Sequence, residues 1–246
     1  MANAQALSPA TPRLRRPRRR RATGALDKLP VRAVQRAFDL LALLGAKRIS
    51  ATLSTLARDS ALPVSTVARL LSALEHAGFA RRDTESHYRA GPRLVQIGIA
   101  SLRSFSIYDM SEPHLRRLSK TSGETANLVV RADAENAIYL RQILSPRTIH
   151  HAAWLGRLLP IRKTAAGAAV AGDLNTEGYV AKRDTLELGV TAIAAPVRGP
   201  DGEIVAAFSI TGPSFRIAER DVARLGALVA KEARLASAEL GAPPPA

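Results

Sequence analysis

Three short segments with helical periodicity follow one another between residues 31 and 78, and they constrain the fold more than any other feature of the sequence. Apolar side chains recur at spacings of three and four in each segment, which predicts one buried face per helix. The predicted inward residues are Val34, Phe38, Leu41 and Leu44 in the first segment, Leu53, Leu56 and Ala57 in the second (51–59), and Val67, Leu70, Leu71 and Leu74 in the third (64–76). Gly45 and Gly78 are typical helix ends, and Pro63 closes a tight connector, 60–63.

A short basic hairpin follows the third predicted helix. Residues 79–82 and 87–90 predict two strands, and the polar residues 83–86 predict the turn between them. A longer first helix, followed along the chain by two helices with a tight connector and then by such a hairpin, is typical of a winged helix-turn-helix. We therefore expect this domain over residues 31–92.

The third helix has a second face that is small, polar or basic, with no acid before Glu75. Such a face suits a helix that enters the major groove of DNA, where Arg69 could contact a guanine. The candidate DNA contacts are Ser65, Thr66, Arg69 and Ser72 on this helix, and Arg82, Tyr88 and Arg89 in the wing. Plainer alternatives are that Arg69 is a solvated surface residue, that Tyr88 packs inside the wing, and that the whole domain serves protein contacts.

The charge of the chain is unevenly distributed. Its 36 Lys and Arg against 21 Asp and Glu give a formal net charge of +15. The first 32 residues carry nine basic residues against one acid, residues 33–105 carry ten against five, and the remainder is nearly balanced. This asymmetry indicates that the N-terminal part of the chain binds a polyanion, which we interpret as double-stranded DNA.

Residues 1–30 predict a disordered, Arg-rich tail. Seven arginines lie between Arg13 and Arg21, and Pro9, Pro12 and Pro17 prevent a continuous helix. We expect an arm that lies along phosphates and adds affinity without reading sequence. A transit peptide and a solubilising tail without a partner are the alternatives.

The second half mixes helices with strands that hairpin turns connect, which predicts an α+β domain. Expected strands are 125–131, 136–142, 148–154, 190–197 and 203–210. Expected helices are 108–122 with Leu115 and Leu118 inward, a helix beginning at 164–171, and 218–240 with Val222, Leu225, Val229 and Leu235 inward.

Ordered motifs in both halves resemble the isocitrate lyase regulator (IclR) family of bacterial transcription factors. In the first half they are VRAVQRA at 31–37, LA at 56–57, LPVSTVARLL at 62–71 and YRAG at 88–91. In the second they are SGETANL at 122–128, LP at 159–160, TAAG at 164–167, GY at 178–179, IAAPV at 193–197 and AFSITGP at 207–213. The likeness spans about residues 31–240, and with it we add Arg36 to the candidate DNA contacts.

The resemblance implies a linker helix at 93–105, a GAF-like effector-binding and oligomerising domain at 106–241, and a short tail at 242–246. It also implies a cytoplasmic, sequence-specific DNA-binding regulator, a homodimer or homotetramer, controlled by a small organic acid. The implied ligand-binding residues are Asn127, Leu128, Leu155, Gly156, Thr164, Ala165, Ala192, Ser209 and Thr211. N–H groups at 164–167 could hold a carboxylate, and Ser209 and Thr211 share one strand face. The alternative is that these hydroxyls, and the rings of Tyr139 and Trp154, serve core packing.

The sequence departs from the family pattern in two places. Family members carry roughly forty further residues between the TAAG and GY motifs, whereas only ten residues separate Gly167 from Gly178 here. The pocket is then more open, is covered by another subunit, or has lost its ligand. Lys182 stands where members that bind keto acids have an acid; its charge favours an anionic ligand, but it cannot accept the same hydrogen bond.

Other function classes find little support. The chain has no cysteine, which excludes disulfides, thiolate metal sites and a cysteine nucleophile. No catalytic motif appears, and His150 and His151 would point to opposite faces of a strand, so we expect no enzyme, cofactor or metal site. No apolar run is long enough to span a membrane. The alternatives to the regulator are a ligand-insensitive DNA-binding or nucleoid-associated oligomer, and an interaction module whose basic arm binds RNA.

Overall fold

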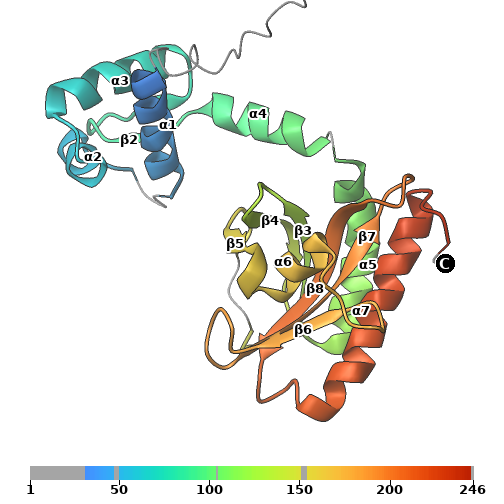
Figure 1. Ribbon diagram of the computed structural model, residues 1–246. Coiled ribbons are helices and arrows are strands. Elements are labelled where there is room, and N and C mark those ends of the chain that lie inside the picture. The colour runs from blue at the N-terminus through green and yellow to red at the C-terminus, as the bar shows by residue number, and fades with distance from the viewer. Residues whose placement is uncertain (1–30, 47–49, 104, 151–153, 245–246) are drawn as a thin grey trace, which may run out of the picture. The chain divides into compact units, whose positions relative to one another are not determined.

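The computed structural model describes residues 31–46, 50–103, 105–150 and 154–244 (Figure 1). The predicted tail at 1–30, His151 and the last two residues of the C-terminal tail lie outside this range. The contacts of the chain divide it into two units, and the boundary between Ile97 and Gly98 falls inside helix α4 (Pro92–Arg103). Each unit is described by itself.

The first unit contains the predicted three helices and two-stranded wing. Its elements are α1 (Val31–Ala46), α2 (Leu53–Ser60), α3 (Val64–His76), β1 (Ala80–Arg82) and β2 (Tyr88–Ala90). The limits of α3 agree with the prediction. Helix α2 begins two residues later than predicted, because the Thr52 hydroxyl accepts from the N–H of Thr55 as an N-cap. The backbone of Ala51, predicted as helical, instead pairs with Tyr88 and extends the wing.

The predicted buried face of α1 is partly wrong. Val34 and Phe38 are 52% and 61% exposed, whereas Leu40 and Leu44 are buried in the core that α2, α3 and the wing share. Leu41 is only half-buried beside them. The helix is thus rotated from the expected orientation, since it carries apolar residues on more than one face and its neighbours select one of them.

The second unit is a six-stranded antiparallel sheet with helices on both faces (Figure 1). The strand order is β5-β4-β3-β8-β7-β6. The strands are β3 (Thr125–Arg131), β4 (Asn136–Ile143), β5 (Leu158–Pro160), β6 (Val180–Arg183), β7 (Val190–Arg198) and β8 (Ile204–Pro213). Helices α5 (Ser106–Ser122) and α7 (Glu219–Glu239) cover one face, and α6 (Ala165–Ala171), preceded by a 3-10 turn (Ile161–Lys163), covers the other.

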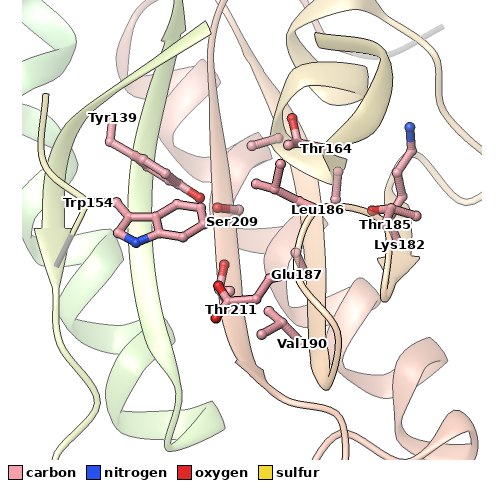
Figure 2. A pocket seen from close by; sticks show the side chains of 13 residues that line it. Tyr139, Trp154, Thr164, Lys182, Thr185, Leu186, Glu187, Val190, Ser209 and Thr211 are labelled. Carbon is pink, nitrogen blue, oxygen red and sulfur yellow. The ribbon is translucent and has the colours of Figure 1, made fainter. Parts of the chain in front are cut away.

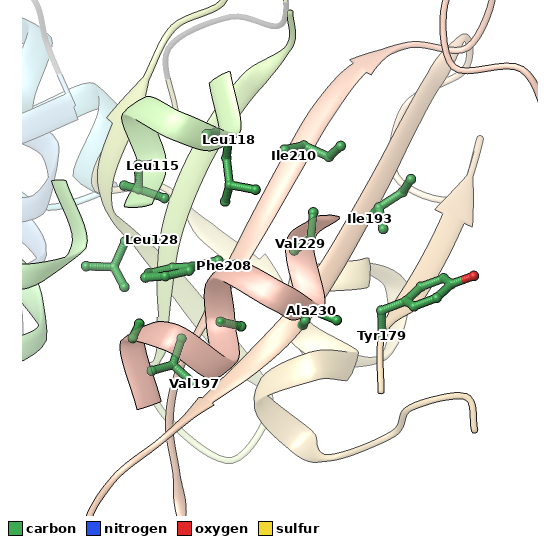
Figure 3. Packing of buried hydrophobic residues seen from close by; sticks show 14 of the residues in the cluster. Leu115, Leu118, Leu128, Tyr179, Ile193, Val197, Phe208, Ile210, Val229 and Ala230 are labelled. Carbon is green, nitrogen blue, oxygen red and sulfur yellow. The ribbon is translucent and has the colours of Figure 1, made fainter. Parts of the chain in front are cut away.

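Each sheet face has its own apolar core. Leu115 and Leu118 of α5 and Val229 of α7 pack against Leu128 and Phe208 from neighbouring strands (Figure 3). On the other face, the small side chains of α6 lie against residues such as Val129 and Ala207. Because strand side chains alternate, adjacent residues of β3 serve opposite cores.

Two expectations for this unit are wrong, and two short strands were not predicted. Residues 148–150 form a loop rather than part of a strand, with 151–153 outside the described residues, and the strand that pairs there with β4 is β5. The short strand β6 was not predicted. Leu235, expected inward on α7, is 43% exposed, while Ala233 and Ala236 face the sheet instead.

The short connection between α6 and β6 is a closed turn. Gly172 ends α6 in the left-handed conformation, and the N–H of Asp173 returns to the carbonyl of Ala168. The Asn175 side chain then accepts from the N–H groups of Glu177 and Tyr179, and Tyr179 leads into β6. The sheet is thereby completed without the longer family segment.

Candidate nucleic-acid interface and ligand pocket

Helix α3 presents the face expected to contact DNA. Ser65, Arg69, Ser72 and Ala73 are exposed and Thr66 is half-buried, while Val67 and Leu71 hold the opposite face in the core. The first turn contains no acidic residue. Among the described residues, no carboxylate forms an ion pair with Arg69, so its guanidinium is available to an outside acceptor.

The wing is fixed to this helix by backbone and side-chain contacts. Glu75, the first acid of α3, accepts from the N–H of Arg82 at 3.3 Å. Gly91 lies so close to Gly78 that an added Cβ would stand 2.2 Å from the Gly78 carbonyl oxygen. Its N–H donates to Phe79 at 2.8 Å, which closes the base of the hairpin.

The three predicted wing contacts lie in different environments. Tyr88 is a core residue, only 8% exposed, and the Arg82 guanidinium lies 5.6 Å from the centroid of the Tyr88 ring. Arg89 donates to Asp83 at 2.7 Å across the turn and remains partly exposed. The backbone N–H of His87, followed by the Arg89 side chain, lowers the pKa of Asp83, so this carboxylate stays charged and stiffens the turn. Tyr88 therefore fits packing rather than DNA contact.

Three further arginines extend the basic surface of the first unit. The predicted Arg36 is exposed on α1. Arg81 of the wing and Arg93 at the start of α4 are also exposed and were not singled out from the sequence. Arg93 lies with its guanidinium 5.7 Å from the Phe79 ring centroid, so that it flanks the wing. Side chains alternate between the two faces of a strand, and this alternation along β1 could have identified Arg81 as an exposed residue.

A pocket lies on the α6 face of the second unit (Figure 2). Five of the nine predicted ligand residues line it: Thr164, Ala165, Ala192, Ser209 and Thr211. Strand register places Ala192 of β7 beside Thr211 of β8, and Lys182 of β6 pairs with Ala192 in turn. The shared face of Ser209 and Thr211 was predicted, and both indeed line the pocket.

The polar floor of the pocket is a hydrogen-bond network centred on Asn127. The Asn127 amide donates to the hydroxyls of Ser209 at 3.2 Å and Thr211 at 3.3 Å. Its oxygen accepts from Gln142 at 2.7 Å, and Gln142 in turn accepts from the Trp154 backbone N–H at 3.0 Å. Asn127 thus orients the two hydroxyls rather than lining the pocket itself, and it holds the turn that carries Trp154.

Two aromatic rings form one wall. Tyr139 and Trp154 meet edge to face with centroids 6.2 Å apart, and the Arg157 guanidinium lies 4.0 Å from the Trp154 ring centroid. Burial raises the pKa of Tyr139 to about 12, although the Thr211 hydroxyl opposes this shift, so the phenol is neutral. These rings do line the pocket, so core packing alone does not describe them.

Besides Asn127, three predicted ligand residues do not line the pocket. Leu128 is buried on the other sheet face, against α5 and α7, because it follows Asn127 by one residue. Leu155 is 62% exposed, and Gly156 adopts a positive φ of 77° in the surface turn after Trp154. The residues that line the pocket and were not predicted as ligand contacts are Tyr139, Trp154, Ala166, Lys182, Thr185, Leu186, Glu187 and Val190.

The start of α6 is engaged within the protein. Thr164 is its N-cap, and its hydroxyl accepts from the N–H of Gly167 at 3.0 Å and donates to the Pro160 carbonyl. Lys182 directs its ammonium to the carbonyl of Arg162, at 2.6 Å, at the pocket edge. The N–H groups at 164–167 were expected to hold a carboxylate, but one of them, that of Gly167, already donates to the Thr164 hydroxyl.

The pocket has little free space. Its free volume is about 30 Å³, against roughly 300–1,000 Å³ for typical ligand sites. Within the residues that the structure describes, no group of three or more metal-binding side chains comes together. No helix in that part of the chain is long and apolar enough to cross a membrane.

Family models match most of the chain. The "IclR helix-turn-helix domain" matches residues 33–84, and "Bacterial transcriptional regulator IclR C-terminal" matches 99–172 and 172–238, two stretches that meet at the short α6–β6 connection. The acetate operon repressor of Salmonella typhimurium is 28% identical over 257 residues, 89% of this chain and 94% of its own. That alignment is longer than the whole chain, which fits a missing segment.

Solved structures have the same fold. The Thermotoga maritima IclR has a TM-score of 0.69 at 22% identity and covers 86% of this chain and 99% of its own. An IclR homologue from Microbacterium hydrocarbonoxydans, complexed with 4-hydroxybenzoate, has a TM-score of 0.69 at 21% identity and covers 85% and 98%. The matched family consists of DNA-binding transcriptional regulators and not of enzymes, as predicted. The chain belongs to the IclR family of bacterial transcriptional regulators.

Proposed function

We propose that this regulator recognises a specific operator through α3. The exposed face of α3, which carries Arg69 and has no acidic residue before Glu75, is the observation that carries the proposal. Arg69 would contact a guanine, and Ser65, Thr66 and Ser72 would contact base edges or phosphates. Arg36, Arg82 and Arg89 would neutralise phosphates beside the groove.

Operator recognition of this kind requires at least a dimer, because one helix-turn-helix reads only a half-site. Helix α4 supports this part of the proposal. Val95, Ile97 and Ile99 are all at least half exposed, although they are apolar. A second copy of α4 would cover them, in a homodimer or as part of a homotetramer. On this proposal the protein acts in the cytoplasm, where operator DNA lies.

A small organic acid is the proposed effector. The pocket offers two oriented hydroxyls, an aromatic wall and the nearby ammonium of Lys182. The homologue complexed with 4-hydroxybenzoate supports a small organic acid as the class of effector. Because the pocket is nearly filled, the acid would select a minor, more open arrangement and change the spacing of paired α3 helices.

Fluorescence anisotropy with DNA from the regulator's own upstream region tests operator recognition. We expect a preference of about a thousandfold over scrambled duplex, and Arg69→Ala should remove about 1–3 kcal/mol of it. Arg224→Ala, at an exposed arginine of α7, is the matched control and should leave the preference intact. An equal loss on both duplexes would show that Arg69 contacts only phosphate.

A ligand-insensitive DNA-binding or nucleoid-associated oligomer is the second candidate. The small free volume and the short α6–β6 connection favour it. Such a protein keeps the dependence on α3 but does not respond to any metabolite. A screen of organic acids in the operator-binding assay separates the two candidates.

A further inference from the structure

The turn between β6 and β7 inserts its own side chains into the effector pocket. Thr185, Leu186 and Glu187 all line the pocket. Figure 2 shows the Glu187 side chain extending from this turn toward Thr211, at the polar floor. Glu187 is the one acidic residue among the lining residues.

This turn has a defined conformation rather than an open loop. Asp184 adopts a positive φ of 56°, and its carboxylate accepts from the N–H of Gly189 at 2.7 Å. The backbone closes with Asp184 donating to Val190 at 2.9 Å and Val190 donating to Glu187 at 3.3 Å. Ser214 attaches the turn to the end of β8 through the Gly189 carbonyl at 2.7 Å. The position of Glu187 is therefore built into the turn.

The Glu187 side chain extends toward the polar floor, the part of the pocket in which an acid effector is proposed to bind. It faces the hydroxyl-bearing strand β8, whose Thr211 and Ser209 are held in place by Asn127. The remaining 30 Å³ accommodates about one water molecule. An external carboxylate would meet both occupied space and a like charge.

We propose that Glu187 is an internal occupant of the effector pocket, a tethered carboxylate that an external acid must displace. The inference rests on the proposed function, because it takes the effector to be an acid bound at this site. Displacement is feasible because Glu187 belongs to an exposed turn and not to the apolar core. The apparent affinity for any acid is then the intrinsic affinity multiplied by the fraction of molecules in which the Glu187 side chain has withdrawn from the pocket.

The single tryptophan of the chain reports directly on this occupancy, because Trp154 lines the same pocket. Quenching of its fluorescence by neutral acrylamide measures how accessible the pocket is, whatever the effector is. Glu187→Ala should raise the quenching constant above wild type, since the truncated side chain vacates the pocket. Glu187→Gln keeps the shape and should raise quenching by iodide, an anion, more than quenching by acrylamide.

Glu203→Ala is the matched control, since Glu203 is also an exposed glutamate in a hairpin turn but does not line the pocket. It should leave both quenching constants unchanged. If Glu187→Ala also leaves acrylamide quenching unchanged, Glu187 does not occupy the pocket and the proposal is wrong. Preserved circular dichroism shows that each variant is folded.

Titration with benzoate separates this inference from the proposed effector. Displacement predicts that Glu187→Ala binds benzoate about tenfold more tightly than wild type, or more, as expected for an open state populated at 10% or less. Equal affinities in the two proteins overturn displacement while leaving an acid effector in place. Raised quenching without benzoate binding in either protein supports the internal occupant and contradicts an effector of the benzoate type.

Discussion

Gly167 lies at the closest approach between α6 and the turn before it. A Cβ at this position would stand 2.4 Å from the Ile161 Cα and 2.6 Å from the Thr164 hydroxyl. Two of the three nearest atoms belong to the backbone of Ile161, which cannot rotate away. We predict that Gly167→Ala lowers the free energy of unfolding by about 1–3 kcal/mol, as overpacking does. Urea unfolding of the purified protein measures the change.

Gly98 provides the control for that substitution. It lies in α4, and nothing stands within 4 Å of its added Cβ. Gly98→Ala should therefore be neutral or stabilise by up to about 1 kcal/mol through helix propensity. A Gly167→Ala variant as stable as Gly98→Ala would contradict the close packing of α6.

The orientation of α1 yields a second prediction. Leu40 is fully buried, so Leu40→Ala should cost about 2–5 kcal/mol of unfolding free energy. Phe38 is 61% exposed, so Phe38→Ala should change stability by less than about 0.5 kcal/mol. Thermal and urea unfolding check both values. If Phe38→Ala cost more unfolding free energy than Leu40→Ala, the buried face of α1 would be the one that periodicity predicted.

The predicted ligand residues that do line the pocket lie on regular elements or at their caps, and their ligand contacts stay a prediction. Ser209 and Thr211 follow from strand alternation, and Thr164 follows from its place before a small-residue helix. Leu128 was assigned to the pocket with its neighbour Asn127, although alternation sends the two to opposite faces. Glu187 could not be recognised, because its position depends on the path of an irregular turn.

At the scale of elements, α5 and α7 are joined by a buried polar cluster. His114 is fully buried and lies 2.8 Å from Glu232 of α7, which also accepts from Arg117 at 3.1 Å. Burial raises the pKa of Glu232, but the hydrogen bonds and charges of Arg117 and His114 outweigh it, and the net pKa is lowered from 4.5. The charged form of Glu232 therefore stabilises the helix pair.

The lowered pKa of Glu232 predicts acid sensitivity of this helix pair. A carboxyl group with a depressed folded-state pKa contributes stability above its unfolded value of 4.5, and this contribution is lost as the pH falls through the folded value. We expect the unfolding free energy of wild type to decrease below pH 4.5 more steeply than that of Glu232→Gln. Urea titrations between pH 3 and 7 test this, and parallel pH profiles would contradict it.

Within the second unit, the strands that could be predicted are the long ones. The long strands β3, β4, β7 and β8 contain enough alternation and have clear turns between them. Strands β5 and β6 have three and four residues, too few for a period-two pattern to stand out, and sheet pairing alone defines them. Residues 148–150 lack such a partner and form a loop.

At the scale of the whole molecule, charge and fold divide along the same line. The excess of basic residues lies in the first unit, which carries α3 and the wing, whereas the second unit is nearly neutral and carries the pocket. DNA affinity and effector response should therefore be separable by mutation. Arg69→Ala should weaken operator binding without changing the accessibility of Trp154, and Glu187→Ala should do the reverse in the absence of effector.

The first 21 residues supply the last test at this scale, because they add seven arginines to the charge of the first unit. Each cation that neutralises a phosphate releases counterions and steepens the salt dependence of binding. Deletion of residues 1–21 should make the slope of log affinity against log salt shallower by up to about six. The preference for operator over scrambled duplex should remain, since phosphate contacts carry no sequence information. Anisotropy titrations at several salt concentrations measure both quantities, and an unchanged slope would mean that these arginines do not contact the DNA backbone.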